Sequence, residues 1–122
     1  MKKLLLAASA CALMAGAASA EDVKIGILIG FTGPIESLTG HMANAAEAAM
    51  AEVNASGKAK NNYIPVRGDD TCTDAAAATA ATERAVTAEG VKGIIGGDCS
   101  GVTRAMLTNV AMPNGIVMVS PS

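Results

Sequence analysis

The sequence has 122 residues, of which 51% are hydrophobic and 2% aromatic, with nine basic and eleven acidic side chains. A formal net charge of −2, without a long basic run, argues against nucleic acids and anionic membrane surfaces as partners. The length suffices for one small domain, whose core must use Ile, Val, Leu, Met and Ala because there is no Trp and only one Phe and one Tyr.

The first twenty residues have the pattern of a bacterial secretory signal peptide. Two lysines follow the initiator methionine, residues 4–15 are uncharged and apolar, and residues 18–20 form a small-residue cleavage site. The apolar stretch is too short to span a bilayer, so we expect a cleaved signal over residues 1–20 rather than a membrane anchor. Without its lysines, seven basic residues remain against eleven acidic ones. We therefore expect residues 21–122 to act in the periplasm.

The exported segment begins with a β-branched apolar run, residues 23–29, which predicts a strand buried on both faces of a parallel sheet. Residues 30–40 contain the turn signal Gly33-Pro34 and are predicted to form a long loop. Residues 41–53 predict a helix with an apolar stripe at three- and four-residue spacing. The stripe comprises Met42, Ala45, Ala46, Ala49, Met50 and Val53.

Strands and helices alternate along the rest of the chain. A strand is predicted at residues 63–67, where Pro65 favours an edge position or an irregularity because it has no N–H to donate. A helix follows at residues 75–89, capped by Thr73 or Asp74. The remaining predicted elements are a strand at 91–95, a helix at 101–112 and a strand at 116–119. Repeated βαβ units predict an α/β fold with a parallel sheet and helices on both faces.

Ligands of open parallel sheets bind at the carboxyl ends of the strands. In the turn Gly96–Gly101, Ser100 is predicted to cap the following helix and Gly101 leaves the backbone open. This arrangement is typical of a site for a carboxylate, although an ordinary cap that serves only its own helix is an alternative. Asp98 is expected to face solvent, where it is able to attract a ligand ammonium group. The acidic pair Asp69-Asp70 is expected to be a solvated turn.

Two cysteines, Cys72 and Cys99, lie on two of the loops that leave strand ends. An even number in an exported protein is read first as a disulfide. A metal pair and a nucleophilic Cys99 are the alternatives. With His41 as the single histidine, the ligands for a structural zinc site are too few, and we expect neither a metal nor a cofactor.

Several motifs together resemble the first lobe of the branched-chain amino acid binding proteins, the periplasmic solute-binding proteins of ABC importers. They are residues 23–29, 32–34, 69–72, 90–96, 99–101 and 115–122. The resemblance covers essentially all of residues 21–122. It implies a two-lobed fold that closes on an amino acid, of which this chain is the N-terminal, incomplete part of the first lobe.

The resemblance also implies roles for individual residues. Cys72 and Cys99 would form a disulfide, and Ser100 would bind the ligand carboxylate through its hydroxyl and backbone N–H. Ser122 would offer its main-chain carbonyl to the ligand amino group. Leucine binders carry an aromatic residue near Leu38 or Thr39, and because this sequence has none there, it leaves the preferred ligand side chain open.

The expected function is capture of a branched-chain amino acid, or a related small carboxylate, for the membrane permease of an ABC importer. The full-length protein is expected to be a monomer and not an enzyme. The alternatives are the ligand-binding domain of an extracytoplasmic sensor and, less favoured, an enzyme that uses Cys99 as nucleophile. Because the second lobe is absent, we expect weak or no binding by this part alone.

Overall fold

The computed structural model describes residues 20–122, so the expected signal peptide lies outside the described residues except for Ala20. The strands are β1 (Glu21–Ile29), β2 (Asn61–Asp69), β3 (Gly93–Gly96) and β4 (Val117–Val119). The helical segments are α1 (Glu36–Ala55), α2 (Ala75–Arg84), η1 (Ala85–Glu89), α3 (Ser100–Met106) and η2 (Leu107–Ala111). Within residues 20–122, no helix is both long and apolar enough to cross a membrane.

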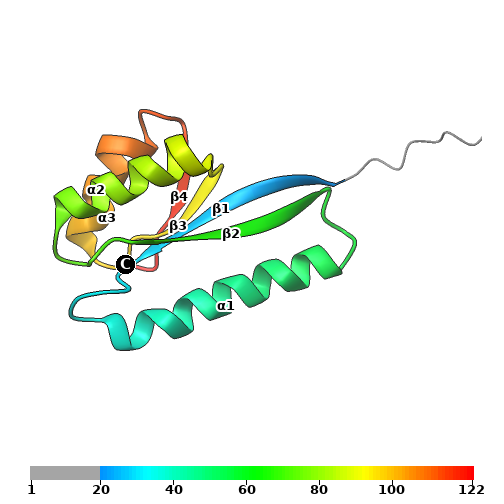
Figure 1. Ribbon diagram of the computed structural model, residues 1–122, viewed down its shortest axis with the longest axis horizontal. Coiled ribbons are helices and arrows are strands. Elements are labelled where there is room, and N and C mark those ends of the chain that lie inside the picture. The colour runs from blue at the N-terminus through cyan, green and yellow to red at the C-terminus, as the bar shows by residue number, and fades with distance from the viewer. Residues whose placement is uncertain (1–19) are drawn as a thin grey trace, which may run out of the picture.

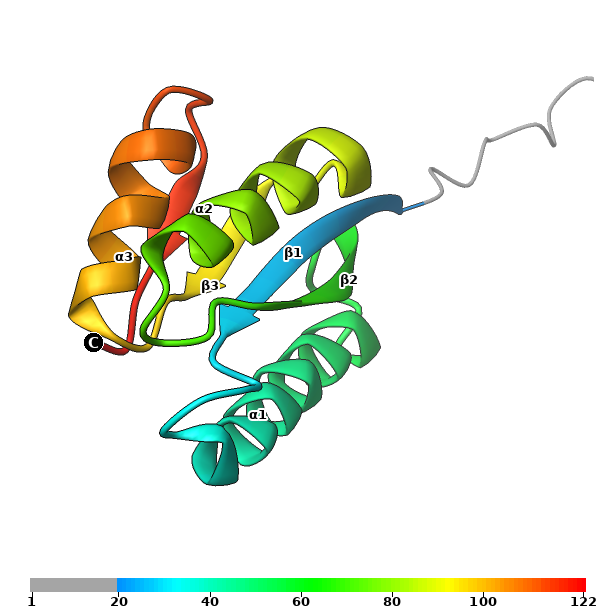
Figure 2. The ribbon, with the colours of Figure 1, turned by 60° about the vertical axis from the view of Figure 1, so that its left-hand side comes forward.

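All strands run parallel in one sheet, in the order β2-β1-β3-β4. Helix α1 covers one face of the sheet, and α2 and α3 cover the other (Figures 1 and 2). The predicted α/β fold with helices on both faces is therefore confirmed. Pro65 lies in β2, which is an edge strand as expected.

Side chains of β1 alternate between two cores because successive residues of a strand point to opposite faces. Ile27 and Ile29 pack with Ala43 and Met50 of α1 on one face. On the other face, Leu28 is fully buried against α2 and α3. Strand β1 thus packs against the helices on both faces of the sheet, in agreement with its nearly continuous apolar sequence.

Helix α1 differs from the prediction in its start and in its buried face. It begins at Glu36, so the first loop covers only residues 30–35. Its buried residues are Thr39, Ala43 and Met50. Most of the predicted stripe is therefore wrong: Met42 is 36% and Val53 44% exposed. Thr39 belongs to the buried face because its hydroxyl donates to the Gly30 carbonyl at 2.9 Å.

The predicted helix over residues 75–89 is present as α2 continued by the π-helical segment η1. Asp74 is the N-cap, and its carboxylate accepts hydrogen bonds from the N–H groups of Ala76 and Ala77. Gly90 ends the run with a left-handed φ of 74°, as a C-terminal glycine does. Likewise, α3 is continued by η2 over residues 100–111. The last two strands are shorter than predicted, since β3 begins at Gly93 and β4 at Val117.

Candidate ligand-binding site at the carboxyl edge of the sheet

The carboxyl ends of the strands meet at one edge of the sheet, and the candidate site residues lie on the loops and helix starts that follow these ends. In the ladders, Ile29 is opposite Asp69, Leu28 is opposite Gly96, and Ile95 is opposite Val119. The C-terminus of the described chain lies beside the start of α3 (Figure 2). Segments remote in sequence are therefore brought together at this edge.

The turn between β3 and α3 requires glycine at two positions. Gly96 has φ +139°, and a Cβ there would overlap the carbonyl oxygen of Leu28. At Gly97, a Cβ would lie 2.7 Å from Asp70 Oδ2 and 3.0 Å from Thr103 Oγ1. The turn consequently packs directly on the end of β1 and on a buried carboxyl group.

Ser100 is the first residue of α3, and the N-cap is Cys99, whose side chain makes no capping bond. The predicted capping role of Ser100 is therefore wrong, and its hydroxyl serves another contact. Ser100 Oγ lies 2.9 Å from Ser122 Oγ. The hydroxyl of Ser120 donates to the Gly97 carbonyl at 2.6 Å and accepts from the Ser122 N–H at 3.0 Å. The segment after β4 is thus fastened to the turn by serine hydroxyls.

The first turn of α3 presents backbone N–H groups at the same place. The first intrahelical bond runs from Thr103 N to Cys99 O at 2.9 Å, so the preceding N–H groups of the helix point out of its end. Gly101 is exposed, and no atom lies within 4 Å of the position a Cβ would take. Hydroxyls and N–H groups beside open space are chemically suited to hold a carboxylate.

A disulfide joins Cys72 to Cys99, with a Cα–Cα distance of 5.1 Å. It connects the loop after β2 to the residue before Ser100, which confirms the pairing expected from sequence. Because both sulfurs are in the bond, the structure does not support a thiol nucleophile at Cys99. The described residues contain no group of three or more His, Cys, Asp or Glu side chains able to hold a metal ion.

Asp70 is fully buried, with 0% of its surface exposed, so the expectation of a solvated Asp69-Asp70 turn is wrong for this residue. Its Oδ1 accepts from Cys72 N at 2.9 Å and its Oδ2 from Asp98 N at 3.3 Å. Burial raises the pKa of Asp70 to about 6, and the nearby carboxylate of Asp98 acts in the same direction, against the Cys72 N–H.

The expectation that the Asp98 side chain faces solvent is wrong. Its Oδ2 accepts a hydrogen bond from Gly30 N at 2.9 Å, and its Oδ1 is buried without a hydrogen-bond partner. The side chain turns toward the end of β1 because that end leaves an N–H to be satisfied. Contact between Asp98 and a ligand ammonium group remains a prediction.

Leu38 lies on the first turn of α1, not on a loop, and 59% of its surface is exposed. The adjacent Thr39 anchors this turn to Gly30. In the loop before α1, Thr32 donates from its Oγ1 and its backbone N to the carboxylate of Asp69 at the end of β2, at 2.6 and 3.2 Å. Partial burial raises the pKa of Asp69, but the hydrogen bonds from Thr32 and from the Thr71 N–H lower it by more, so the pKa lies below its usual value.

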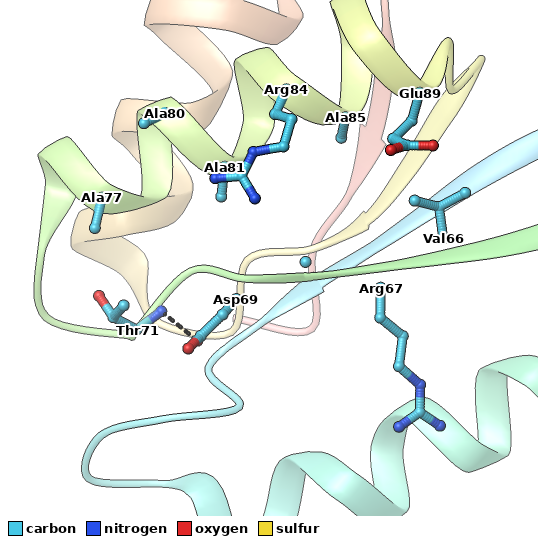
Figure 3. A pocket seen from close by; sticks show the side chains of 11 residues that line it. Val66, Arg67, Asp69, Thr71, Ala77, Ala80, Ala81, Arg84, Ala85 and Glu89 are labelled. Carbon is cyan, nitrogen blue, oxygen red and sulfur yellow. Dashed lines mark hydrogen bonds between the residues drawn. The ribbon is translucent and has the colours of Figure 1, made fainter.

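A separate shallow groove of about 430 Å³ runs between β2 and α2 (Figure 3). Alanines of α2, including Ala77 and Ala81, form one wall, and Arg84 extends toward β2 (Figure 3). Arg67 points instead toward α1, where its Nε lies 2.6 Å from Glu47 Oε1 (Figure 3). No site residue predicted from the sequence lines this groove.

A parallel α/β sheet with polar groups at its carboxyl edge is typical of domains that bind small molecules at strand ends. Comparison with known proteins specifies the family. Residues 22–122 match the family described as periplasmic binding protein, and the chain belongs to that family.

Curated relatives share this similarity over most of the chain. The Leu/Ile/Val-binding protein of Escherichia coli K12 is 32% identical over 121 residues, covering 98% of this chain and 32% of its own length. The Leu/Ile/Val-binding protein homolog 7 of Brucella melitensis is 41% identical over 103 residues, covering 83% of this chain and 25% of its own length. The chain thus spans about a third of the first of these relatives.

A solved structure with the same fold is the branched-chain amino acid transporter substrate binding protein LivJ of Streptococcus pneumoniae, in complex with isoleucine. It superimposes with a TM-score of 0.75 at 28% identity, over 84% of this chain and 29% of its own. The leucine binding protein LivK of Thermotoga maritima gives a TM-score of 0.62 at 26% identity, over 82% of this chain and 27% of its own.

The structure brings Ser100, Gly101 and Ser122 together and places Asp98 beneath the same turn. Leu38 stands apart from these residues on α1. Sequence reasoning missed the anchoring role of Ser120 and the burial of Asp70. Asp70 directly follows the end of β2, where the local sequence carries no signal for its burial.

Proposed function

We propose that this chain is the N-terminal part of the first lobe of a periplasmic substrate-binding protein of an ABC importer. Its ligand is a branched-chain amino acid or a related small carboxylate. The observation that carries the proposal is the contact of Ser100 with Ser122 at the open start of α3, 2.9 Å between hydroxyl oxygens. The names and bound isoleucine of the relatives support the same ligand class.

In this proposal, the ligand carboxylate lies at the first turn of α3. The Ser100 hydroxyl rotates from Ser122 to donate to one carboxylate oxygen, and N–H groups of the first turn donate to the other. The exposed backbone at Gly101 leaves room for this approach. The carbonyl of Ser122 accepts from the ligand ammonium group, and Asp98 contributes negative charge behind it. Leu38 borders the ligand side chain.

The rest of the expected function follows from the same assignment. Residues 1–20 direct export and are removed, and residues 21–122 act in the periplasm. A second lobe completes the ligand surface, and the closed full-length monomer delivers the ligand to a membrane permease. Binding and release require no bond making, so the protein is not an enzyme. The disulfide between Cys72 and Cys99 supports this by leaving neither thiol free.

The proposal is tested by NMR titration of the chain with leucine, isovalerate and leucinamide. Leucine and isovalerate carry a carboxylate, and leucinamide does not. We expect millimolar binding of the first two, with amide shifts centred on Ser100 and Gly101, and no such shifts with leucinamide. Ser100→Ala should reduce the leucine shifts, and Ser56→Ala, in the exposed cap of α1, should not. Equal responses to leucine and leucinamide would contradict a carboxylate site, and micromolar affinity would contradict a half-site.

A further inference from the structure

A chain of hydrogen bonds connects the carboxyl ends of β1, β2 and β3 beside the turn Gly96–Gly101, which is called the Ser100 turn below. Thr39 Oγ1 donates to Gly30 O at 2.9 Å, and Gly30 N donates to Asp98 Oδ2 at 2.9 Å. Asp98 N in turn donates to Asp70 Oδ2 at 3.3 Å, and Cys72 N donates to Asp70 Oδ1 at 2.9 Å. The carboxyl groups of Asp70 and Asp98 therefore connect the ends of β1 and β2 to the turn, and the Gly30 carbonyl connects α1 to the end of β1.

These two carboxyl groups lack a donor for one of their oxygens. Three of the four oxygens accept backbone N–H groups, but Asp98 Oδ1 is buried without a partner. A buried acceptor left unsatisfied costs free energy, and two buried negative charges side by side cost more. A proton on the carboxyl group of Asp70 would remove one charge and supply the donor that Asp98 Oδ1 lacks.

Within residues 20–122, no positively charged side chain contributes to the pKa shift of Asp70. Asp98 is the charged group that acts on Asp70 among the described residues. Asp69 is directed to Thr32 and Thr71, and the neighbouring disulfide is uncharged. The side chains of α3 near Gly97 are those of Thr103 and Met106, and α1 contributes Thr39. The charge must therefore be relieved by a proton or by movement of Asp98.

We propose that Asp70 and Asp98 share one proton and that this proton holds the Ser100 turn against the end of β1. In the protonated state, the O–H of Asp70 donates to Asp98 Oδ1 while Asp98 Oδ2 keeps Gly30 N. When the proton leaves, the two carboxylates repel, and Asp98, the less buried of the two, turns toward solvent. The Gly30 N–H then loses its acceptor, and the turn loosens.

The consequence for the ligand rests on the proposed function. If Ser100 holds the ligand carboxylate, loosening of the turn weakens that contact and adds a negative charge near it. Ligand retention would then fall as the pH rises through the titration of the pair. The proton-sharing itself makes no reference to a ligand and is measured without one.

The experiment is a pH titration of the chain followed by NMR, with ¹³C-labelled aspartate carboxyl groups and backbone amides observed together. The amide of Cys72 reports on Asp70 and that of Gly30 on Asp98, because each donates to that carboxyl group. We expect the amides of Cys72 and Gly30 and the carboxyl carbon of Asp70 to move with one shared midpoint near pH 6, where the pKa of Asp70 lies. Asp98→Asn should lower the midpoint of Asp70 by about one pH unit or more.

Asp22→Asn is the matched control. It removes one carboxylate from β1 at the opposite end of the sheet, where Asp22 accepts a bond from the Asn62 side chain at 2.7 Å, and it should leave the midpoint unchanged. Separate midpoints for the Gly30 and Cys72 amides in the unaltered chain would overturn the proposal, and this measurement needs no variant that must fold. So would an unchanged Asp70 midpoint in Asp98→Asn. If the ligand-induced amide shifts at Ser100 did not depend on pH, the Asp70–Asp98 pair would have no effect on ligand binding, and that part of the proposal would be wrong.

Discussion

The hydroxyl oxygens of Ser100 and Ser122 lie 2.9 Å apart, although 22 positions separate the two residues in the sequence. The contact exists because β3 and β4 are parallel neighbours, so the chain returns to the same edge after α3 and η2. Ser120 strengthens the return by donating to the carbonyl of Gly97. The geometry of the candidate site therefore depends on the turn from Gly96 to Ser100 and on what lies beneath it.

Gly97→Ala should destabilise the fold. The added Cβ would lie 2.7 Å from the buried Asp70 Oδ2, so the turn or the carboxyl group must move. Overpacking of this kind costs about 1–3 kcal/mol of the free energy of unfolding. Urea unfolding followed by circular dichroism measures the loss.

Gly101→Ala is the matched control for that substitution. No atom lies within 4 Å of the Cβ position, and the residue is in the first turn of α3. Because Ala favours helix over Gly, the free energy of unfolding should be unchanged or higher by up to about 1 kcal/mol. Equal destabilisation by both substitutions would show that the close packing around Gly97 does not limit stability.

The disulfide between Cys72 and Cys99 should be a major source of stability. It closes a loop with a sequence separation of 27 residues. The chain-entropy model assigns about 3–4 kcal/mol to a loop of this length. The double variant Cys72→Ala/Cys99→Ala should lose this amount in urea unfolding, and reduction of the unaltered protein should give a similar loss. A double variant as stable as the oxidised protein would contradict the role of the bond.

Asp70 should make stability depend on pH. Its pKa is raised in the folded protein to about 6, so the folded state binds the proton more tightly than the unfolded chain. Its contribution is therefore fully present below the unfolded pKa of about 4 and is lost as pH rises through about 6. The loss is on the order of 2–3 kcal/mol at most.

Comparison with Asp70→Asn isolates this contribution from those of other carboxyl groups, such as Asp69, whose pKa is lowered. The stability of the unaltered protein relative to this variant should fall between about pH 4 and about pH 7. Urea unfolding at closely spaced pH values provides the measurement. A constant difference across this range would show that Asp70 titrates alike in both states.

The alternation of apolar runs and helical segments predicts a parallel α/β fold, because βαβ connections permit few arrangements. The strand order does not follow from the sequence, and only Pro65 favours an edge position for β2. The start of α1 was not predictable in the same way. Gly40 resembles a loop residue after Gly33-Pro34, but it lies within the helix. Of these two glycines, only Gly33 has a positive φ, of 102°. Tertiary contacts of Thr39 decide the helix face, and these are not visible in the local pattern.

At the candidate site, the sequence predicts that Ser100 and Ser122 contact a ligand, but it does not predict the directions of their side chains. Ser100 was found through its glycine neighbours, yet its hydroxyl contacts Ser122 rather than capping its helix. Asp98 was expected in solvent because nothing in the local sequence shows that Gly30 N needs an acceptor. Such assignments depend on strand order, since β1 brings Gly30 between the ends of β2 and β3.

The buried face of α1 can be tested with two methionines. Met50 is 8% exposed and packs with Ile27 and Ile29, whereas Met42 is 36% exposed. Met50→Ala should lower the free energy of unfolding by about 2–3 kcal/mol, through lost burial and the cavity left behind. Met42→Ala should change it by less than about 0.5 kcal/mol, because Ala also favours the helix. Both variants remove the same side-chain atoms, so a difference between them in urea unfolding reports on the position of the residue alone. Similar losses in both would restore the stripe expected from the sequence and contradict the orientation of α1 in the structure.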